Sequence, residues 1–265
     1  DMGDTWEIIS PDLSTNDPAK QNQEESGGLS ADNSGAENHT TIFTIAESPL
    51  DENVIWVGTD DGNVQVTRDG GKTWTYTIAN VAGLPANTGG YHIEASSLDK
   101  GTSYAVFDGH TRGDMTPYAY KTTDYGASWT YIINGEVEGP VRNIQEDYVN
   151  PDLLFLGTEF GLYVTLDGGK SWSKFTKNMP SAAIHFIDLQ KRTSDLVMGT
   201  HGRGVIIIDD ISPLRGLTPQ ILAKNVHFFE NAPTTINETS TFSGGFGNAA
   251  IDFRGPSKTK SLQLK

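Results

Sequence analysis

Thr165-Leu166-Asp167-Gly168-Gly169-Lys170-Ser171-Trp172 decides the fold, because this stretch has two further full copies in the chain. They are Thr67-Arg68-Asp69-Gly70-Gly71-Lys72-Thr73-Trp74 and Thr122-Thr123-Asp124-Tyr125-Gly126-Ala127-Ser128-Trp129. The chain opens within a fourth copy that lacks the first two positions, Asp1-Met2-Gly3-Asp4-Thr5-Trp6. The aspartates of successive copies lie 43 to 68 residues apart. Such a spacing is typical of a repeated supersecondary unit.

The shared pattern, T-x-D-x-G-x-[ST]-W, is the Asp-box, and its chemistry is that of a tight hairpin turn. The aspartate accepts hydrogen bonds from the backbone of its own turn, and the glycine tolerates a positive φ. The tryptophan is expected to be buried between neighbouring sheets. We therefore assign a structural role to three positions of each full copy: Asp69, Gly71 and Trp74; Asp124, Gly126 and Trp129; Asp167, Gly169 and Trp172.

A second repeat precedes the turns and predicts the remaining strands. A Gly-Thr-x-x-Gly element lies between two short apolar runs in Trp56–Thr67, Leu156–Thr165 and Met198–Asp209. A further apolar strand is predicted before each unit, at Thr41–Ala46, His92–Ala95, Val141–Gln145 and Ile184–Leu189. Four short antiparallel strands, A to D, recurring along the chain indicate an all-β fold and the blades of a β-propeller.

The repeats predict an incomplete propeller over residues 1–212. Blades are expected at about 39–80, 91–134, 141–178 and 183–209, the last without an Asp-box, and residues 1–10 supply only a D strand. Residues 11–38 form a long acidic loop insertion. A linker at 213–230 and the beginning of a β-sandwich-like domain at 231–265 follow, with strand candidates at Val226–Phe229, Ala249–Phe253 and Ser261–Leu264. Three blades and two part-blades leave open edges, so the chain is expected to be a portion of a larger propeller.

Composition excludes several classes of function. The 265 residues carry a net charge of −15, which argues against nucleic acid as a partner. Residues 1–40 hold nine acidic residues and one basic residue, so −8 of that charge lies in and around the loop insertion. There is no cysteine, which excludes disulfides and thiolate chemistry. No run approaches 18 apolar residues, so no membrane insertion is predicted.

The strand order predicts which loops share a face. The A–B and C–D turns lie on one face, and the B–C turns and D–A connections lie on the other. The second face collects the longer and chemically more varied loops, so we place binding there. The candidate binding residues are Asp60, Asp61, His110, Arg112, Asp114, Arg142, Glu159, His201 and Arg203.

Each candidate also has a purely structural interpretation. Asp60 and Asp61 precede Gly62 and suit a turn, and His201 suits a hydrogen bond to the backbone of the central channel. Each arginine could instead form an ion pair. Arg203 could pair with Asp209, Asp210 or Glu159, and Arg142 could pair with Glu146 or with a neighbouring blade. No cofactor is predicted. Cation binding by Asp108, His110 and Asp114, or calcium binding by the 11–38 loop, is the alternative.

The Asp-boxes, the Gly-Thr-x-x-Gly turns and the run Gly199-Thr200-His201-Gly202-Arg203-Gly204 to Asp209-Asp210-Ile211-Ser212-Pro213-Leu214 together resemble bacterial sortilin-like Asp-box propeller proteins. Glu37-Asn38-His39-Thr40-Thr41-Ile42 and Phe107-Asp108-Gly109-His110 resemble the same group. Such proteins are similar to the vacuolar-sorting-receptor propellers and more distantly to xyloglucan-cleaving glycosidases. The resemblance implies an exported protein of a Gram-negative bacterium, in the periplasm, at the outer cell surface or outside the cell.

The function expected from these patterns is that of a binding or scaffold module. Every repeated motif has a structural explanation, and no nucleophile, metal or phosphate motif occurs. The expected ligand is a protein, a peptide or a glycan, and the expected partners include the remaining blades, from the same polypeptide or from another chain. The alternative is a glycoside hydrolase with paired carboxylates on the same face or in blades outside this chain. A purely structural subunit of a cell-surface complex is a third hypothesis. The catalytic residues of a hydrolase cannot be assigned from the sequence.

Overall fold

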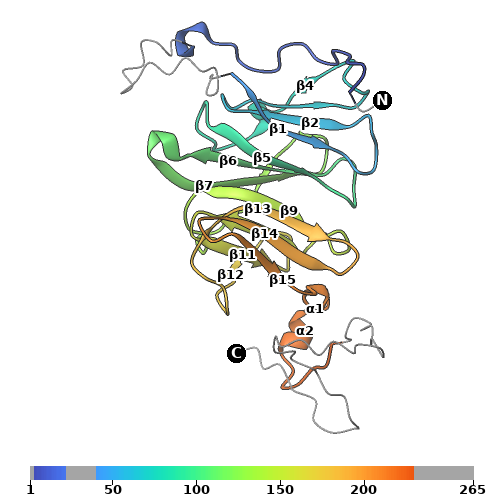
Figure 1. Cartoon of the computed structure of the whole chain (residues 1–265), viewed down its shortest axis with the longest axis vertical. Coiled ribbons are helices and arrows are strands. Elements are labelled where there is room, and N and C mark those ends of the chain that lie inside the picture. The colour runs from blue at the N-terminus through green and yellow to red at the C-terminus, as the bar shows by residue number, and fades with distance from the viewer. Residues whose placement is uncertain (1–2, 22–39, 230–265) are drawn as a thin grey trace, which may run out of the picture. The chain divides into compact units, whose positions relative to one another are not determined.

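The computed structural model of the chain describes residues 3–21 and 40–229 (Figure 1). Contacts divide the chain into two units, Asp1–Arg215 and Gly216–Lys265. The described part of the second unit, residues 216–229, contains one short helix, α2 (Pro219–Leu222). None of the helices in the described ranges is long and apolar enough to cross a bilayer. Most of the predicted loop insertion and the predicted domain at 231–265 lie outside the described residues.

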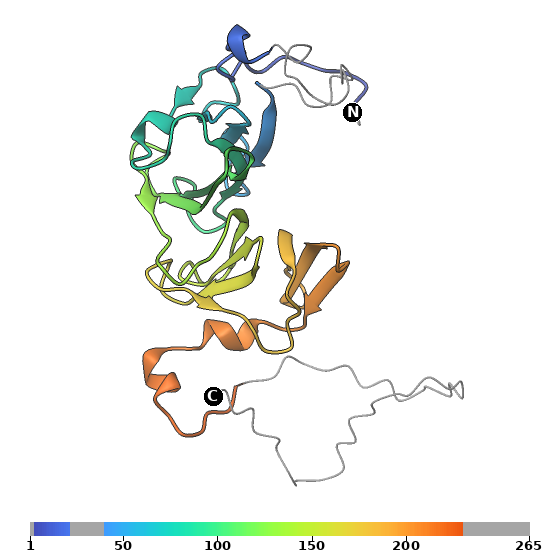
Figure 2. The ribbon, with the colours of Figure 1, turned by 90° about the vertical axis from the view of Figure 1, so that its left-hand side faces the viewer.

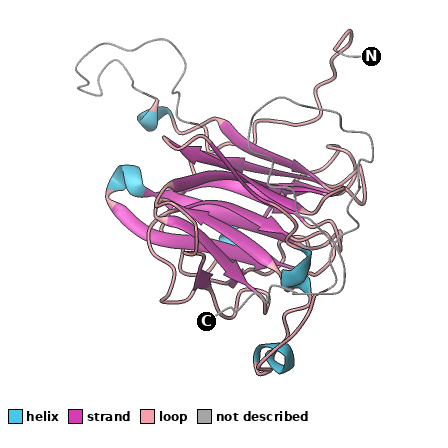
Figure 3. Ribbon diagram, turned by 60° about the horizontal axis from the view of Figure 1, so that its bottom comes forward, coloured by secondary structure: helices cyan, strands magenta, loops and turns pink. Residues whose placement is uncertain are grey.

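The first unit consists of four antiparallel sheets, each built from consecutive strands, and we number these sheets as blades 1 to 4 (Figures 2 and 3). Blade 1 contains β1 (Ile42–Glu47), β2 (Ile55–Thr59), β3 (Val64–Thr67) and β4 (Thr75–Tyr76). Blade 2 contains β5 (Gly89–Ala95), β6 (Ser103–Gly109), β7 (Asp114–Thr122) and β8 (Thr130–Tyr131). Blade 3 contains β9 (Val141–Glu146), β10 (Leu154–Thr158), β11 (Gly161–Thr165) and β12 (Ser173–Lys174). Blade 4 contains β13 (Ala183–Gln190), β14 (Asp195–His201) and β15 (Val205–Ile208).

These sheets confirm the predicted fold class, an all-β partial propeller of antiparallel blades. The A strands β1, β5, β9 and β13 contact one another in that order, so the blades converge on them. We call these four the inner strands. Among the described residues of the first unit, helical structure is limited to single turns: η1 (Pro18–Lys20), η3 (Ile78–Asn80), η4 (His110–Arg112) and α1 (Ser212–Arg215).

The Asp-box turns are closed by their own side chains. In blade 1, Asp69 accepts hydrogen bonds from the backbone and hydroxyl of Thr73 at 2.8 and 2.7 Å. The Thr67 hydroxyl donates to Asp69 at 2.8 Å and accepts from the Gly71 amide at 2.9 Å. Hydrogen bonds from the Thr73 hydroxyl and backbone lower the pKa of Asp69 to about 2, so the carboxylate stays ionised. The turns around Asp124 and Asp167 repeat these contacts.

Backbone hydrogen bonds join each Asp-box turn to the A–B turn of its own blade. Gly70 donates to the Asn53 carbonyl at 3.0 Å, and Gly168 donates to the Asp152 carbonyl at 2.9 Å. The corresponding bond in blade 2 runs from Tyr125 to the Gly101 carbonyl at 2.9 Å. The A–B and C–D turns therefore lie on one face, as the strand order predicts.

Tryptophan and glycine connect successive blades. The Trp172 indole donates to the carbonyl of Ile132, three residues after Trp129, at 2.6 Å. The Trp74 indole donates at 3.1 Å to the carbonyl of Ile9, three residues after Trp6. A Cβ on Gly169 would lie 2.9 Å from the side chain of Ile132, so only glycine allows this approach.

Apolar side chains fill the spaces between successive blades and form three clusters. One isoleucine of each inner strand packs toward the preceding blade: Ile93, Ile144 and Ile187 are all buried. Ile45 holds the same position in blade 1 but is 65% exposed, because no further blade precedes it in the described residues.

Three details of the sequence prediction are wrong. Residues 3–10 form no strand, because the described residues include no C strand beside them. Val226–Phe229 form no strand either, and the predicted linker contains most of α1 and all of α2. Trp129 and Trp172 are buried as expected, but Trp74 is only half-buried because the blade before it is incomplete.

Substitution of two equivalent tryptophans tests this account of the core. We expect Trp172→Ala to lower the free energy of unfolding by about 3–5 kcal/mol, since it removes a buried ring and its hydrogen bond. Trp74→Ala is expected to cost less than about 2 kcal/mol, because that ring keeps solvent contact. Urea unfolding followed by far-ultraviolet circular dichroism measures both. Equal losses would contradict the dependence of burial on the preceding blade.

Candidate functional site

Every inner strand carries a β-bulge at the same position. The pairing with the B strand skips one residue between Ile42 and Thr44, Gly90 and His92, Val141 and Asn143, and Ile184 and Phe186. A bulge leaves its extra residue unpaired and redirects the side chain. The four extra residues, which we call the bulge row, are Phe43, Tyr91, Arg142 and His185. They lie where the inner strands begin, on the face of the B–C turns and D–A connections.

Neighbouring members of the bulge row contact one another. The rings of Phe43 and Tyr91 lie 5.5 Å apart between centroids. The guanidinium of Arg142 lies 5.0 Å from the centroid of the Tyr91 ring, within the range of a cation–π interaction. Blades 1, 2 and 3 therefore present a continuous surface of two aromatic rings and one cation.

Arg142 is the centre of a buried ion cluster. Its Nη1 donates to Asp108, and its Nε and Nη2 each lie 3.1 Å from Oε2 of Glu159. Asp108 also contacts Nδ1 of His110 at 2.5 Å. A buried guanidinium is costly without partners, and here two carboxylates compensate it.

Blade 4 adds two histidines to the cluster. His185 Nε2 lies 3.8 Å from Glu159 Oε2, and its ring lies 5.3 Å from that of His201. Burial lowers the pKa of His185, and the charge of Arg142 lowers it further, so we expect the imidazole to be neutral at pH 7. Its Nε2 is buried without a hydrogen-bond partner among the described residues. Bound water or a ligand satisfies such an atom.

The structure brings together four of the nine residues that the sequence predicts for binding: His110, Arg142, Glu159 and His201. Phe43, Tyr91, Asp108 and His185 belong to the same cluster but were not predicted as binding residues. Phe43, Tyr91 and His185 join the cluster because they are bulge residues, and a bulge can be recognised only when the pairing of the strands is known. Of the two predicted partners of Arg142, Glu146 is wrong because it lies at the opposite end of β9, whereas the neighbouring blade does supply a partner, Asp108 of blade 2.

Four of the other five predicted residues hold loops in place. Asp60 accepts from the Thr41 amide at 2.7 Å. Asp61 is buried and accepts from both the amide and the hydroxyl of Thr15 at 2.6 Å, which fastens the start of the loop insertion to blade 1. Arg203 lies exposed in the turn between β14 and β15.

The loop between β6 and β7 is held in the same way. Arg112 donates to the Ala86 carbonyl at 2.9 Å and to the Thr88 hydroxyl at 2.7 Å. Asp114 accepts from the Tyr118 hydroxyl at 2.8 Å. Asp108 and Asp114 thus have different partners, and within the described ranges no three acidic or histidine side chains converge as metal ligands.

The opposite ends of the inner strands enclose an acidic cavity of about 220 Å³. All four blades contribute to it, and its polar lining includes Glu94, Gln145, Glu146, Asp188 and Lys191. This site was not predicted from the sequence. The sequence does contain a signal for it. The residue after the isoleucine of each inner strand is alanine in blade 1, but it is polar in the other three: Glu94, Gln145 and Asp188.

Burial raises the pKa of two carboxyl groups in this cavity. Burial raises the pKa of Glu94 to about 8, and the charge of Glu146 adds to this effect. Burial also raises the pKa of Glu146, which accepts from Ser96 at 2.6 Å and Tyr104 at 2.9 Å. Burial lowers the pKa of His92, whose Nε2 lies 3.9 Å from Glu94, to about 4. A carboxyl group that keeps its proton near neutral pH can act as a proton donor.

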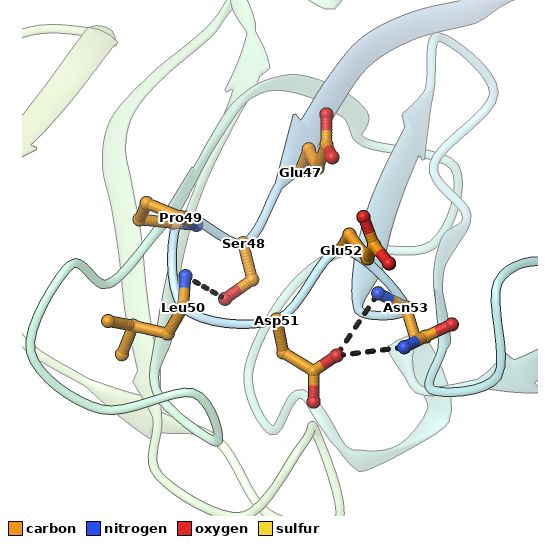
Figure 4. Close-up of a pocket in the computed structure, with 7 residues that line it drawn as sticks. All are labelled: Glu47, Ser48, Pro49, Leu50, Asp51, Glu52 and Asn53. Atoms are coloured by element: carbon orange, nitrogen blue, oxygen red, sulfur yellow. Dashed lines mark hydrogen bonds between the residues drawn. The ribbon is translucent and has the colours of Figure 1, made fainter.

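A further hollow on this face, of about 580 Å³, is formed by the first A–B turn, residues 47–53 (Figure 4). The Leu50 amide donates to the Ser48 hydroxyl at 3.3 Å. Asp51 accepts from the amide and side chain of Asn53 at 3.1 Å. These hydrogen bonds hold a turn of consecutive residues, so we assign no chemistry to this hollow.

Comparison with known proteins supports the fold. No protein-family model matches the sequence, and no curated protein matches it either. The GH74 enzyme of Niastella koreensis has a TM-score of 0.50 at 14% identity, covering 66% of this chain and 29% of that chain. YCF48 bound to D1 peptide has a TM-score of 0.48 at 19% identity, covering 64% and 52%. The GH74 xyloglucanase of Xanthomonas campestris has a TM-score of 0.46 at 16% identity, covering 63% and 28%.

This chain therefore spans about half of the YCF48 chain and less than a third of the GH74 chains. The likeness to the Niastella koreensis structure is one of fold, and it agrees with the blades described above: the chain contains part of a β-propeller.

The buried proton of Glu94 predicts a pH dependence. The folded pKa of about 8 lies above the ordinary value of 4.5, so the folded state holds a proton that the unfolded state releases. Stability is therefore lost as the pH rises from about 4.5 to 8. We expect Glu94→Gln to raise the free energy of unfolding at pH 8.5 by about 1–3 kcal/mol and to change it little at pH 4.5. Urea titrations at both pH values measure this, with exposed Glu136→Gln as the control for loss of a charge. Parallel pH profiles of Glu94→Gln and the parent chain would contradict it.

Proposed function

We propose that this chain is a binding module of a larger propeller and that its ligand binds over the bulge row. One observation carries the proposal: the four bulges are equivalent in backbone geometry, but their side chains are phenylalanine, tyrosine, arginine and histidine. The Asp-box positions, which have a structural role, instead carry the same residue types in every full copy. A repeated backbone with varied side chains at one end of the inner strands is typical of a recognition surface.

The chemistry of the cluster favours a protein or peptide with a basic side chain. Asp108 and Glu159 carry two negative charges against the single charge of Arg142, so the cluster has one negative charge in excess. Glu159 remains about a third exposed, and Arg142, with which it pairs, also packs on the ring of Tyr91. A lysine or arginine side chain could pair with the carboxylate and stack on the rings. A glycan that stacks on the same rings is the alternative ligand.

The wider setting of the module is part of the proposal. The resemblance to bacterial sortilin-like propellers supports an exported protein. Exposed apolar side chains on both end blades support association with further blades, from the same polypeptide or from another chain.

Peptide arrays test the ligand. We expect the chain to bind arrayed peptides that contain Lys or Arg in preference to versions with Gln at those positions. Glu159→Gln and Tyr91→Ala should weaken this binding about tenfold or more. Glu52→Gln, at an exposed position in the first A–B turn on the opposite face, and Tyr76→Ala, at an exposed position in β4, are the matched controls. Equal binding by the row variants and the controls would refute the proposed site.

The acidic cavity favours glycoside hydrolysis as a second candidate function. Glycosidases use one protonated and one ionised carboxyl group, and Glu94 keeps its proton near neutral pH beside Glu146 and Asp188. These carboxyl groups lie on the Asp-box face, opposite the face on which the sequence placed the candidate acids. Purified protein should then release reducing ends from plant or microbial polysaccharides, and Glu94→Gln and Asp188→Asn should abolish the release. Unchanged release by both variants would exclude the cavity as the active site.

A further inference from the structure

A pocket of about 260 Å³ lies between the Asp-box turns of blades 2 and 3, beside the outermost strand β8 of blade 2. Both of these blades have four strands and a full Asp-box, so complete blades form the pocket. Its lining shares no residue with the bulge row or with the acidic cavity. It is therefore a third place at which the chain can receive a ligand.

The pocket is hollow because two bulky side chains of the preceding junction between blades are replaced by small ones. Between blades 1 and 2, the guanidinium of Arg68 stacks 4.0 Å from the centroid of the Tyr125 ring and fills this position. The equivalent residues between blades 2 and 3 are Thr123 and Gly168, and both line the pocket. Neither side chain fills the space that the pair of Arg68 and Tyr125 occupies.

Each of the two blades contributes one lysine to the pocket. Lys121 comes directly before the Asp-box of blade 2, and Lys170 lies within the Asp-box of blade 3. The junction between blades 1 and 2 has Val66 and Ala127 at these positions. Of these two junctions, only the hollow one has a lysine on both sides.

The two lysines have no anionic partner. In the part of the chain that the structure describes, no carboxylate forms an ion pair with Lys121 or Lys170. The ammonium group of Lys121 lies 5.2 Å from the centroid of the Tyr104 ring, and its charge acts on Glu146 without an ion pair. No acidic residue belongs to the described lining. In a chain with a net charge of −15, this lining is positive and favours an anionic group as ligand.

The remaining walls of the pocket suit a sugar ring. Tyr131 is 44% exposed, and its hydroxyl donates to the Pro117 carbonyl at 2.8 Å, which holds the aromatic ring in place. Thr123 and Thr130 are exposed, and their hydroxyls form no hydrogen bond with another described residue. A fixed aromatic face can pack on the C–H groups of a sugar, and the hydroxyls can exchange hydrogen bonds with it. The volume lies below the range of about 300–1,000 Å³ that encloses drug-sized ligands, so it suits a single sugar unit.

We propose that this pocket binds an acidic sugar unit of a polysaccharide, with the negative group between Lys121 and Lys170 and the sugar ring against Tyr131. A uronic acid, which carries a carboxylate, and a sulfated sugar share this chemistry. An acidic peptide also carries carboxylates but has no sugar ring to pack on the tyrosine, so it is the competing ligand in the test. The site is separate from the bulge row, and the proposal does not depend on the function proposed above.

Calorimetric titration with four probes tests the class of ligand: oligogalacturonate, dextran sulfate, neutral dextran and polyglutamate. A salt concentration of about 0.15 M screens the repulsion between an anionic probe and a chain of net charge −15. We expect one or both of the anionic polysaccharides to bind and neutral dextran not to bind. Binding of oligogalacturonate alone identifies a uronic acid, and binding of dextran sulfate alone identifies a sulfated sugar. Polyglutamate bound as tightly as the better polysaccharide, or no binding of either polysaccharide, would refute the proposal.

Single substitutions test whether binding occurs in this pocket. Lys121→Gln and Lys170→Gln should each weaken binding of the better polysaccharide about tenfold, because each removes one charged hydrogen-bond donor. Lys72→Gln is the matched control, since Lys72 is exposed at the same position of the blade 1 Asp-box. Equal losses for Lys72→Gln and Lys170→Gln would show attraction to positive charge in general and would overturn the site.

A variant with a filled pocket separates the site from general charge attraction. Thr123→Arg combined with Gly168→Tyr copies the stack of Arg68 on Tyr125. Tyr125 has φ +58° and Gly168 has φ +71°, so a tyrosine is already accepted at this position of the turn in blade 2. The double variant adds a positive charge, yet we expect it to bind about tenfold more weakly or worse, because the side chains occupy the pocket. Unchanged or tighter binding by a double variant with the parent's melting temperature would refute the proposal.

Discussion

The fold depends on the closure of each Asp-box turn by its own carboxylate. An aspartate such as Asp69 accepts three hydrogen bonds from neighbouring threonines and so fixes the turn without help from the rest of the chain. The turn then presents to the preceding blade a glycine that admits close approach and, in blades 1 and 3, an indole that donates to a carbonyl three residues after the previous tryptophan. Local closure and the contact between blades therefore come from the same eight residues. This is why a short repeat can specify both the hairpin and the stacking of sheets.

The sequence predicted the blades well because their determinants are local. The Asp-box and Gly-Thr-x-x-Gly motifs fix turns, and the strands between them are short, so the boundaries followed within a few residues. Prediction failed where a strand needs a partner that lies elsewhere. Glu7 and Ile8 have the sequence of a D strand, but they form none without a C strand beside them.

The candidate sites were harder to predict because they depend on pairing between strands. Arg142 and Glu159 could be placed on one face from loop order alone, but Tyr91 and His185 join them only through the bulges. Glu94 was missed because its chemistry comes from burial and from Glu146 on the next blade, and neither is visible in the residues around it. The two ends of the inner strands thus differ in character. At the end with the bulge row, the guanidinium of Arg142 is paired with carboxylates. At the opposite end, the carboxyl groups of Glu94 and Glu146 have no cation paired with them as closely.

The bulges also separate the proposed recognition surface from the contacts that fold the blades. Because each bulge residue stands outside the hydrogen-bonded ladder of its blade, its side chain can change while the pairing on either side stays intact. The inner strands therefore offer a row of positions, one per blade, at which selection can act almost independently. A family built on this scaffold could acquire new ligands by single substitutions, one blade at a time, while its Asp-boxes remain unchanged.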